Sequence, residues 1–139
     1  MATVLFVCKA NQGRSVVSQA LLERAAGGRH RGLSAGSEAQ PGGAAHPEVV
    51  EAMAELGVDV SAHDPQRHTR EIAEQADVVV TMGCGDACPY IPGKRYVDWD
   101  LPDPKGRPLD EVRATRDDIA ARVEGLVAEL DGGDARPAG

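Results

Sequence analysis

The segment from Thr3 to Ser15, which reads TVLFVCKANQGRS, decides the fold of this chain. Its first part, Thr3 to Cys8, is almost entirely apolar, as in a strand that is buried on both faces of a sheet. A polar loop follows, and Ser15 to Ala26 then has the pattern of a helix that ends at Gly27. A buried strand that leads through a short loop into a helix is typical of a parallel α/β sheet.

Strands and helices alternate along the rest of the chain. The pattern predicts short strands at 33–35 and 95–97, a buried strand at 77–82, helices at 47–56 and 69–76, and a C-terminal helix with apolar residues from Val112 to Leu130. We therefore predict one α/β domain over residues 1–131, with a central four-stranded parallel sheet flanked by helices, and a disordered tail over residues 132–139. Ligands in such folds bind beyond the carboxyl ends of the strands.

Composition narrows the classes of function. The chain has 139 residues and a formal net charge of -7, which argues against nucleic acids and anionic membranes as main partners. It contains no apolar run of the roughly 20 residues that a membrane helix needs. Its N-terminus lacks the basic and apolar regions of a secretory signal, so we expect a cytoplasmic protein. Thiols are kept reduced in that compartment, and the three cysteines are therefore candidates for catalysis, redox chemistry or metal binding rather than structural disulfides.

The loop after the first strand combines a thiol with an anion-binding pattern. Cys8 and Arg14 are separated by five residues, and Ser15 opens the helix. Backbone N–H groups of such a loop can converge on a tetrahedral oxyanion, and an arginine can bind it through two charge-assisted hydrogen bonds. The same positive surroundings favour a thiolate at Cys8, to which Ser15 can donate a hydrogen bond. We predict Cys8 as the nucleophile and an oxyanion-binding set that consists of Lys9, Ala10, Asn11, Gln12, Gly13, Arg14 and Ser15, in which Gly13 permits the curvature and Asn11 fixes the loop.

A second candidate group is a carboxylate between prolines. Asp100 and Asp103 lie in the segment WDLPDP at 99–104, and Pro104 restricts Asp103 to an extended conformation. A nucleophile that displaces an oxygen from an oxyanion needs a proton donor. We predict Asp103 as this donor and Asp100 as the less favoured candidate; an ordinary acidic turn is the alternative.

The third candidate is a pair of cysteines, Cys84 and Cys88, directly after the predicted strand at 77–82. In a helix their Cα atoms would lie about 6 Å apart, which is within the range of a disulfide. A zinc site is disfavoured because the spacing is not Cys-x-x-Cys and no second compact ligand pair follows. We interpret the two residues as a resolving dithiol, with two unrelated buried cysteines as the alternative.

In combination, these residues resemble the thioredoxin-coupled arsenate reductases, whose fold is shared with the low-molecular-weight protein tyrosine phosphatases. The resemblance covers nearly the whole chain, through VLFVC at 4–8, SAG at 34–36, VVVTM at 78–82 and Asp103-Pro104. Both families have the oxyanion loop, whereas Cys84 and Cys88 indicate the reductases. A potassium site of some relatives uses acidic residues where this chain has Gln19 and Gln66, so we do not extend that site to this chain.

The resemblance implies a sequence of thiol reactions. Cys8 attacks arsenic, Arg14 and the loop amides bind the oxyanion, and Asp103 protonates the leaving oxygen. Cys84 then attacks Cys8 with release of arsenite, and Cys88 attacks Cys84, so that thioredoxin can reduce the resulting disulfide. The implied partners are arsenate and thioredoxin, and no metal or cofactor is needed.

Three alternatives stay open from the sequence. The same loop would serve a phosphatase that hydrolyses phosphate monoesters, in which Cys84 and Cys88 have no part in turnover. The reductant of an arsenate reductase could be a low-molecular-weight thiol or mycoredoxin instead of thioredoxin. The three thiols could also bind arsenite without catalysis, although Arg14 and Asp103 would then have no purpose. His30, His46, His63 and His68 show no ligand spacing, and we predict no role for them.

Overall fold

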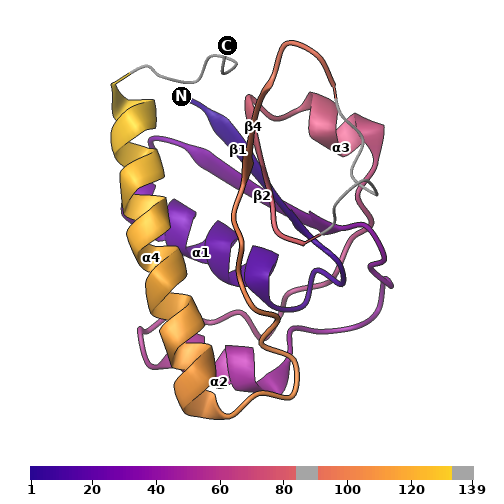
Figure 1. Cartoon of the computed structure of the whole chain (residues 1–139), viewed down its shortest axis with the longest axis vertical. Helices are drawn as coiled ribbons and strands as arrows, with labels where there is room; N and C mark the ends of the chain where they lie inside the picture. Colours follow the sequence, from indigo (N-terminus) through magenta and orange to yellow (C-terminus); the bar gives the residue numbers. More distant parts are fainter. Residues whose placement is uncertain (84–90, 133–139) are drawn as a thin grey trace.

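A computed structural model describes residues 1–83 and 91–132 and contains a four-stranded parallel sheet (Figure 1). Its strands are β1 (Thr3–Cys8), β2 (Arg31–Gly36), β3 (Val78–Thr81) and β4 (Arg95–Asp98). Their order in the sheet is β2-β1-β3-β4, so that β1 is paired on both sides. This position explains why β1 is almost wholly apolar, and it places the end of β1 at the middle of the sheet.

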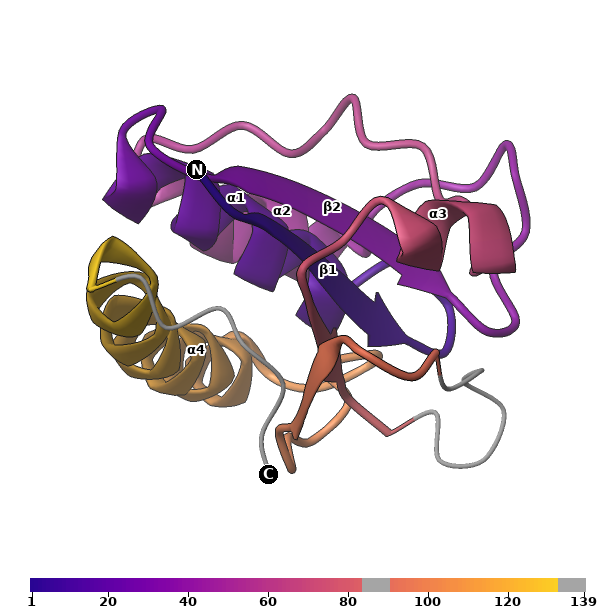
Figure 2. The ribbon, with the colours of Figure 1, turned by 90° about the horizontal axis from the view of Figure 1, so that it is seen from above.

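Helices cover both faces of the sheet. The helices are α1 (Arg14–Ala26), α2 (Pro47–Ala54), α3 (Arg70–Glu74) and α4 (Leu109–Asp131). The helices α1, α2 and α4 share one hydrophobic cluster with Val4, Phe6 and Val80 of the sheet. The opposite face packs Leu5 and Val7 against α3 (Figure 2). The predicted α/β class with a parallel sheet is confirmed.

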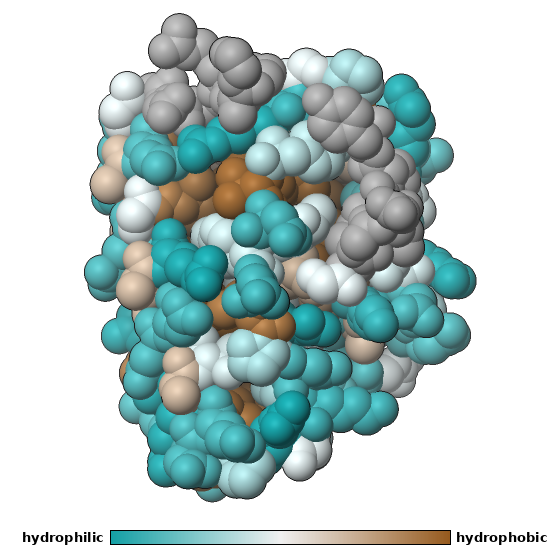
Figure 3. Space-filling model, viewed as in Figure 1, coloured by the Kyte–Doolittle hydropathy of each residue, from teal (hydrophilic) through white to brown (hydrophobic). Residues whose placement is uncertain are grey.

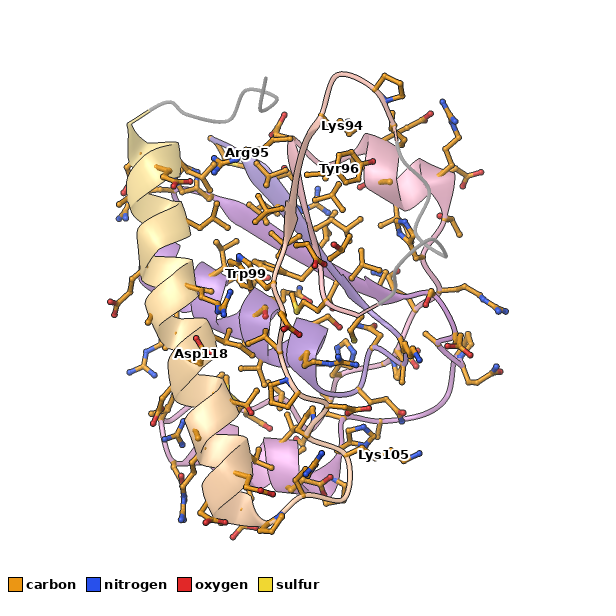
Figure 4. All side chains as sticks on the ribbon, in the orientation of Figure 1. Lys94, Arg95, Tyr96, Trp99, Lys105 and Asp118 are labelled. Carbon is orange, nitrogen blue, oxygen red and sulfur yellow. The ribbon has the colours of Figure 1, made fainter. Side chains whose placement is uncertain are left out.

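The core is built from aliphatic side chains, and its aromatic part is small. Phe6 and Trp99 form one tilted pair with ring centroids 5.8 Å apart. Arg122 of α4 lies 6.0 Å from the centre of the Trp99 ring. Trp99 itself lies between the sheet and α4 (Figure 4). Trp99 therefore links the sheet, α4 and the start of the segment that contains Asp103.

Several element boundaries differ from the prediction. The strand β2 is longer than residues 33–35 because it pairs with β1 over its whole length, from Arg31 to Gly36. The helix α2 ends at Ala54, before Gly57, whose positive φ of 76° follows a tight turn. The helix α3 begins at Arg70 because the side chain of Thr69 caps it by accepting a hydrogen bond from the backbone N–H of Ile72.

An ion-pair network joins α2 to α4. Glu55 accepts hydrogen bonds from Arg113 at 2.5 Å and from Arg116 at 2.7 Å. The hydrogen bonds from Arg113 and Arg116 lower the pKa of Glu55 to about 2, because they stabilise the charged carboxylate. The network fixes the end of α2 against α4.

The described surface on the face shown in Figure 3 is mostly hydrophilic. On the face shown in Figure 3, hydrophobic residues are visible mainly in recesses between hydrophilic ones. Among the described residues, no helix is long and apolar enough to cross a membrane.

Candidate active site

The site lies at the carboxyl edge of the sheet, where β1 ends and α1 begins. Cys8 is the last residue of β1 and is only 2% exposed. Its Sγ atom lies 3.0 Å from the Oγ atom of Ser15, which is fully buried in the first turn of α1. The structure thus brings together the predicted nucleophile and its predicted hydrogen-bond partner.

The side chain of Asn11 sets the direction of the hydrogen bond between Ser15 and Cys8. Its Oδ1 atom accepts a hydrogen bond from the backbone N–H of Gln66 at 2.9 Å, which fixes the orientation of the amide. Its Nδ2 atom then donates to Ser15 Oγ at 2.8 Å. Because Ser15 Oγ accepts from Asn11, its own proton is free to be donated to the sulfur of Cys8. The arrangement therefore directs a hydrogen-bond donor at the sulfur of Cys8.

Asn11 adopts a left-handed backbone conformation, with a φ of 55°. Asparagine tolerates this region better than most residues do. His63 stabilises the loop here, because its Nε2 atom lies 2.8 Å from the carbonyl oxygen of Asn11 and 3.2 Å from its Oδ1 atom. Both of these atoms are acceptors, so Nε2 is the protonated nitrogen of the ring.

His63 and Gln66 are site residues that the sequence analysis missed. No spacing pattern connects them to Cys8, because an irregular segment at 61–68 brings them to the loop. Part of this segment pairs with the end of β2, where the backbone N–H of Gly36 donates to Gln66 O at 2.9 Å. The pairing with Gly36 is the structural reason that His63 and Gln66 reach Asn11.

Arg14 lies between the oxyanion loop (residues 8–15) and the segment at 99–104, which we call the acid loop. Its side chain is 9% exposed, and its Nη1 atom donates to the carbonyl oxygen of Leu101 at 3.3 Å. Its Nη2 atom lies 3.9 Å from Oδ2 of Asp103, whose side chain is 54% exposed. The other carboxylate oxygen of Asp103 accepts the backbone N–H of Lys105 at 3.0 Å. The structure thus places Asp103, rather than Asp100, beside Arg14.

The acid loop packs directly on the oxyanion loop at Gly13. A Cβ atom on Gly13 would lie 2.7 Å from Cγ of Pro104, which is closer than real side chains approach. Gly13 therefore permits the contact that brings Asp103 to the oxyanion loop. Lys105 follows on the surface, where its side chain points away from the domain (Figure 4).

The backbone of the oxyanion loop is suited to an anion. Within residues 1–83 and 91–132, the N–H groups of residues 10–14 donate to no protein acceptor. The positive end of the α1 dipole adds to their effect at the same place. The side chain of Lys9 is exposed, and the side-chain amide of Gln12 donates to Ala44 O at 2.9 Å. The backbone amides of the loop and the side chain of Arg14 are therefore the hydrogen-bond donors available to an anion.

The polar cluster around Gln19, Ser34 and Gln66 is held together by its own hydrogen bonds and carries no charged side chain among these three residues. The amide of Gln66 donates to Ser34 O at 2.8 Å, and the amide of Gln19 donates to Gly32 O at 3.2 Å. Ser34 Oγ in turn donates to Gln19 Oε1 at 2.6 Å. The carbonyl oxygens of Gly32 and Ser34 thus each accept a hydrogen bond from a neutral amide. The described residues contain no cluster of three or more His, Cys, Asp or Glu side chains that could hold a metal ion.

The predicted dithiol, Cys84 and Cys88, lies outside the described residues. The residue before it, Gly83, is described and lies beside Arg14, because a Cβ atom on Gly83 would be 2.8 Å from Arg14 Nη1. On the far side, the backbone N–H of Ile91 donates to the hydroxyl of Tyr96 at 2.7 Å. Gly83, the last described residue before Cys84, therefore lies directly beside the oxyanion loop.

A strand-end thiol, an oxyanion loop and an acidic residue on a neighbouring loop define the class of low-molecular-weight phosphatase-like enzymes. The chain belongs to the family of low molecular weight phosphotyrosine protein phosphatases, whose model matches residues 3–135.

Its relatives within this family include arsenate reductases. It is 38% identical to a putative arsenate reductase of Halobacterium salinarum over 91% of each chain. The thioredoxin-dependent arsenate reductase Cg_ArsC1' of Corynebacterium glutamicum has a TM-score of 0.82 and 36% identity, and the match covers 96% of this chain and 63% of that one. An arsenate reductase in a phosphate-binding state has a TM-score of 0.79 and 31% identity, with 94% of this chain and 99% of that one covered.

Proposed function

We propose that the chain is an arsenate reductase that uses Cys8 as its nucleophile. The observation that carries this proposal is the buried thiol of Cys8, which lies 3.0 Å from a hydroxyl that Asn11 holds in a donating orientation. The thiolate forms an S–As bond with arsenate, and one oxygen leaves as water. Arg14 and the loop amides bind the other oxygens, and Asp103 supplies the proton for the leaving oxygen.

The reduction itself requires a second thiol. In our proposal Cys84 attacks the sulfur of Cys8, and the electron pair of the S–As bond passes to arsenic, which leaves as arsenite. Cys88 then attacks Cys84, so that Cys8 returns to the thiolate and a Cys84–Cys88 disulfide forms. A dithiol donor reduces this disulfide by the same exchange reaction. Support for the first step comes from Gly83, which directly precedes Cys84 and lies beside Arg14.

We propose thioredoxin as the electron donor. The support is the likeness to the thioredoxin-dependent reductase of Corynebacterium glutamicum, together with the two cysteines that follow Gly83. A low-molecular-weight thiol or mycoredoxin is the alternative donor, and it would not require both resolving cysteines.

A phosphatase is the second candidate function, because the family model is that of a phosphatase. The same loop would bind the phosphoryl group, Cys8 would form a phosphocysteine, and Asp103 would protonate the leaving alcohol. Cys84 and Cys88 would then have no part in turnover. This difference separates the two functions.

The deciding experiment is arsenate-dependent oxidation of NADPH in the presence of thioredoxin and thioredoxin reductase. We expect multiple turnovers with the wild type and none with Cys84→Ser or Cys88→Ser. A parallel assay with a phosphate ester measures the phosphatase reaction in the same three proteins. If none of the three proteins reduces arsenate and all three hydrolyse the phosphate ester, the chain is a phosphatase. Turnover with mycoredoxin or a small thiol, but not with thioredoxin, would reassign the electron donor.

A further inference from the structure

Gly83 lies where β3 leads into the oxyanion site. It adopts a left-handed conformation, with a φ of 84°. A Cβ atom built on it would lie 2.8 Å from Nη1 of Arg14 and 3.7 Å from Cζ of the same guanidinium. Real Cβ atoms essentially never approach another heavy atom closer than 3.0 Å. The guanidinium of Arg14 therefore occupies the space that a side chain at position 83 would need.

The backbone at position 83 has little freedom to move away from Arg14. The residue before it, Met82, is fully buried, and its N–H donates to Val7 O at 2.7 Å. On the other side of β3, the N–H of Trp99 donates to Thr81 O at 2.9 Å. These bonds fix the end of β3 between β1 and the acid loop.

Arg14 is the partner that would have to yield. Its guanidinium is the far end of a flexible side chain, and among the described residues one hydrogen bond of 3.3 Å, to Leu101 O, holds its Nη1 atom. Displacement of Nη1 would break this bond and turn the guanidinium relative to the loop amides and Asp103. A planar guanidinium binds an oxyanion well only in a defined orientation.

We infer that Gly83 is a positioning residue for oxyanion binding that acts through Arg14. Its lack of a side chain leaves the space in which the guanidinium is held against the oxyanion loop. The inference rests on the oxyanion site of the proposed function and deepens it, because it assigns a residue outside the loop a part in binding the substrate. It holds for arsenate and phosphate alike, since both are tetrahedral oxyanions.

The test compares Gly83→Ala with the matched control Gly93→Ala. Gly93 has a similar φ of 92°, but nothing lies within 4 Å of a Cβ atom built there. Both substitutions thus place alanine in a left-handed conformation, and only the first displaces Arg14. We expect Gly83→Ala to weaken phosphate binding, measured by calorimetry, roughly 10- to 100-fold, which is the effect of losing one hydrogen bond to a charged group. The KM for arsenate should rise in parallel, while Gly93→Ala leaves both quantities near the wild-type values.

A double-mutant cycle with Arg14→Lys separates positioning from a general disturbance of β3. Lysine has no Nη1 atom, so Gly83→Ala should add little to the loss of phosphate affinity that Arg14→Lys causes alone. An equal loss in the two backgrounds, or equal affinity of Gly83→Ala and Gly93→Ala for phosphate, would overturn the inference. Thermal melting of each variant shows whether it is folded.

The outcomes also distinguish this inference from the proposed function. If the wild type binds phosphate and Gly83→Ala weakens that binding, the inference stands even if arsenate is not reduced. If the wild type reduces arsenate and Gly83→Ala does so with an unchanged KM, only the inference fails. If the wild type binds neither anion, both fail.

Discussion

The hydrogen bonds around Cys8 can be reversed by one isosteric substitution, Asn11→Asp. Asn11 now donates from Nδ2 to Ser15 Oγ at 2.8 Å, and Ser15 is left to donate to Cys8 Sγ at 3.0 Å. A carboxylate at position 11 can only accept. The hydroxyl of Ser15 would therefore turn toward Asp and away from the thiol. The backbone N–H of Gln66 and Nε2 of His63 would still donate to the carboxylate, which favours its charged form.

The expected magnitude follows from the burial of the group. Cys8, Asn11 and Ser15 are 2%, 0% and 0% exposed, so solvent screens their interactions little. Loss of a hydrogen bond to a charged group costs about 1.5 to 3 kcal/mol, which lowers the equilibrium constant for thiolate formation at Cys8 roughly 10- to 100-fold. The negative charge at position 11 would lower it further.

The assay is the ultraviolet absorbance of the thiolate during a pH titration, in a protein where Cys84 and Cys88 are replaced by serine so that Cys8 is the only thiol. Ser15→Ala is the matched control, because it removes the donor without adding a charge. We expect thiolate formation to require a higher pH in both variants, and the larger change in Asn11→Asp. A titration of Cys8 that is unchanged in both variants would refute the argument that Ser15 donates to the sulfur.

Three further predictions follow from the same geometry. Asp103→Asn should lower kcat/KM for arsenate by roughly 10²- to 10⁴-fold, the usual contribution of a general acid, whereas Asp100→Asn should have little effect. Glu55→Gln should lower the melting temperature at neutral pH, because it removes the ion pairs with Arg113 and Arg116. The difference in melting temperature from the wild type should shrink as the pH falls from 4.5 toward about 2, because protonation of Glu55 in the wild type removes the same ion pairs. Replacement of sodium by potassium in the arsenate assay should leave kcat and KM unchanged, because Gln19 and Gln66 are neutral and their amides donate to the carbonyl oxygens of Gly32 and Ser34. A clear rise in activity would show that a cation binds there.

The part of the fold that depends on local patterns could be predicted from the sequence. The apolar run from Thr3 to Cys8 predicts a central strand, and β1 is indeed paired on both sides. The limits of β2 could not be predicted, because Arg31 and Gly36 are strand residues only through their pairing with β1. Neither residue has an apolar side chain that would indicate a strand, and the pairing is a tertiary interaction.

The same distinction applies to the site. Cys8, Arg14 and Ser15 belong to one short loop, so their spacing in the sequence fixes their geometry. Asp103 is distant in sequence, and its segment predicted a proton donor without fixing its place; the structure sets its carboxylate 3.9 Å from Arg14. His63 escaped prediction because a single histidine in an irregular segment has no characteristic spacing. A role for Gly83 was not predicted, because its effect depends on the absence of a side chain.

The net charge of -7 does not conflict with an anion site, because the charges differ in their exposure. Arg14 is 9% exposed, whereas the carboxylate of Asp103 beside it is 54% exposed. Solvent and ions screen exposed charges over a Debye length of about 8 to 10 Å, but they screen a buried charge much less. A small anion in the oxyanion loop would therefore interact with Arg14, the loop amides and the N-terminus of α1, whereas exposed carboxylates farther away than this length would act on it little. A polyanion extends across the outer surface, where the acidic side chains repel it. This pattern of exposure would favour a small oxyanion over a polyanion, although the outer surface of the protein is not positively charged.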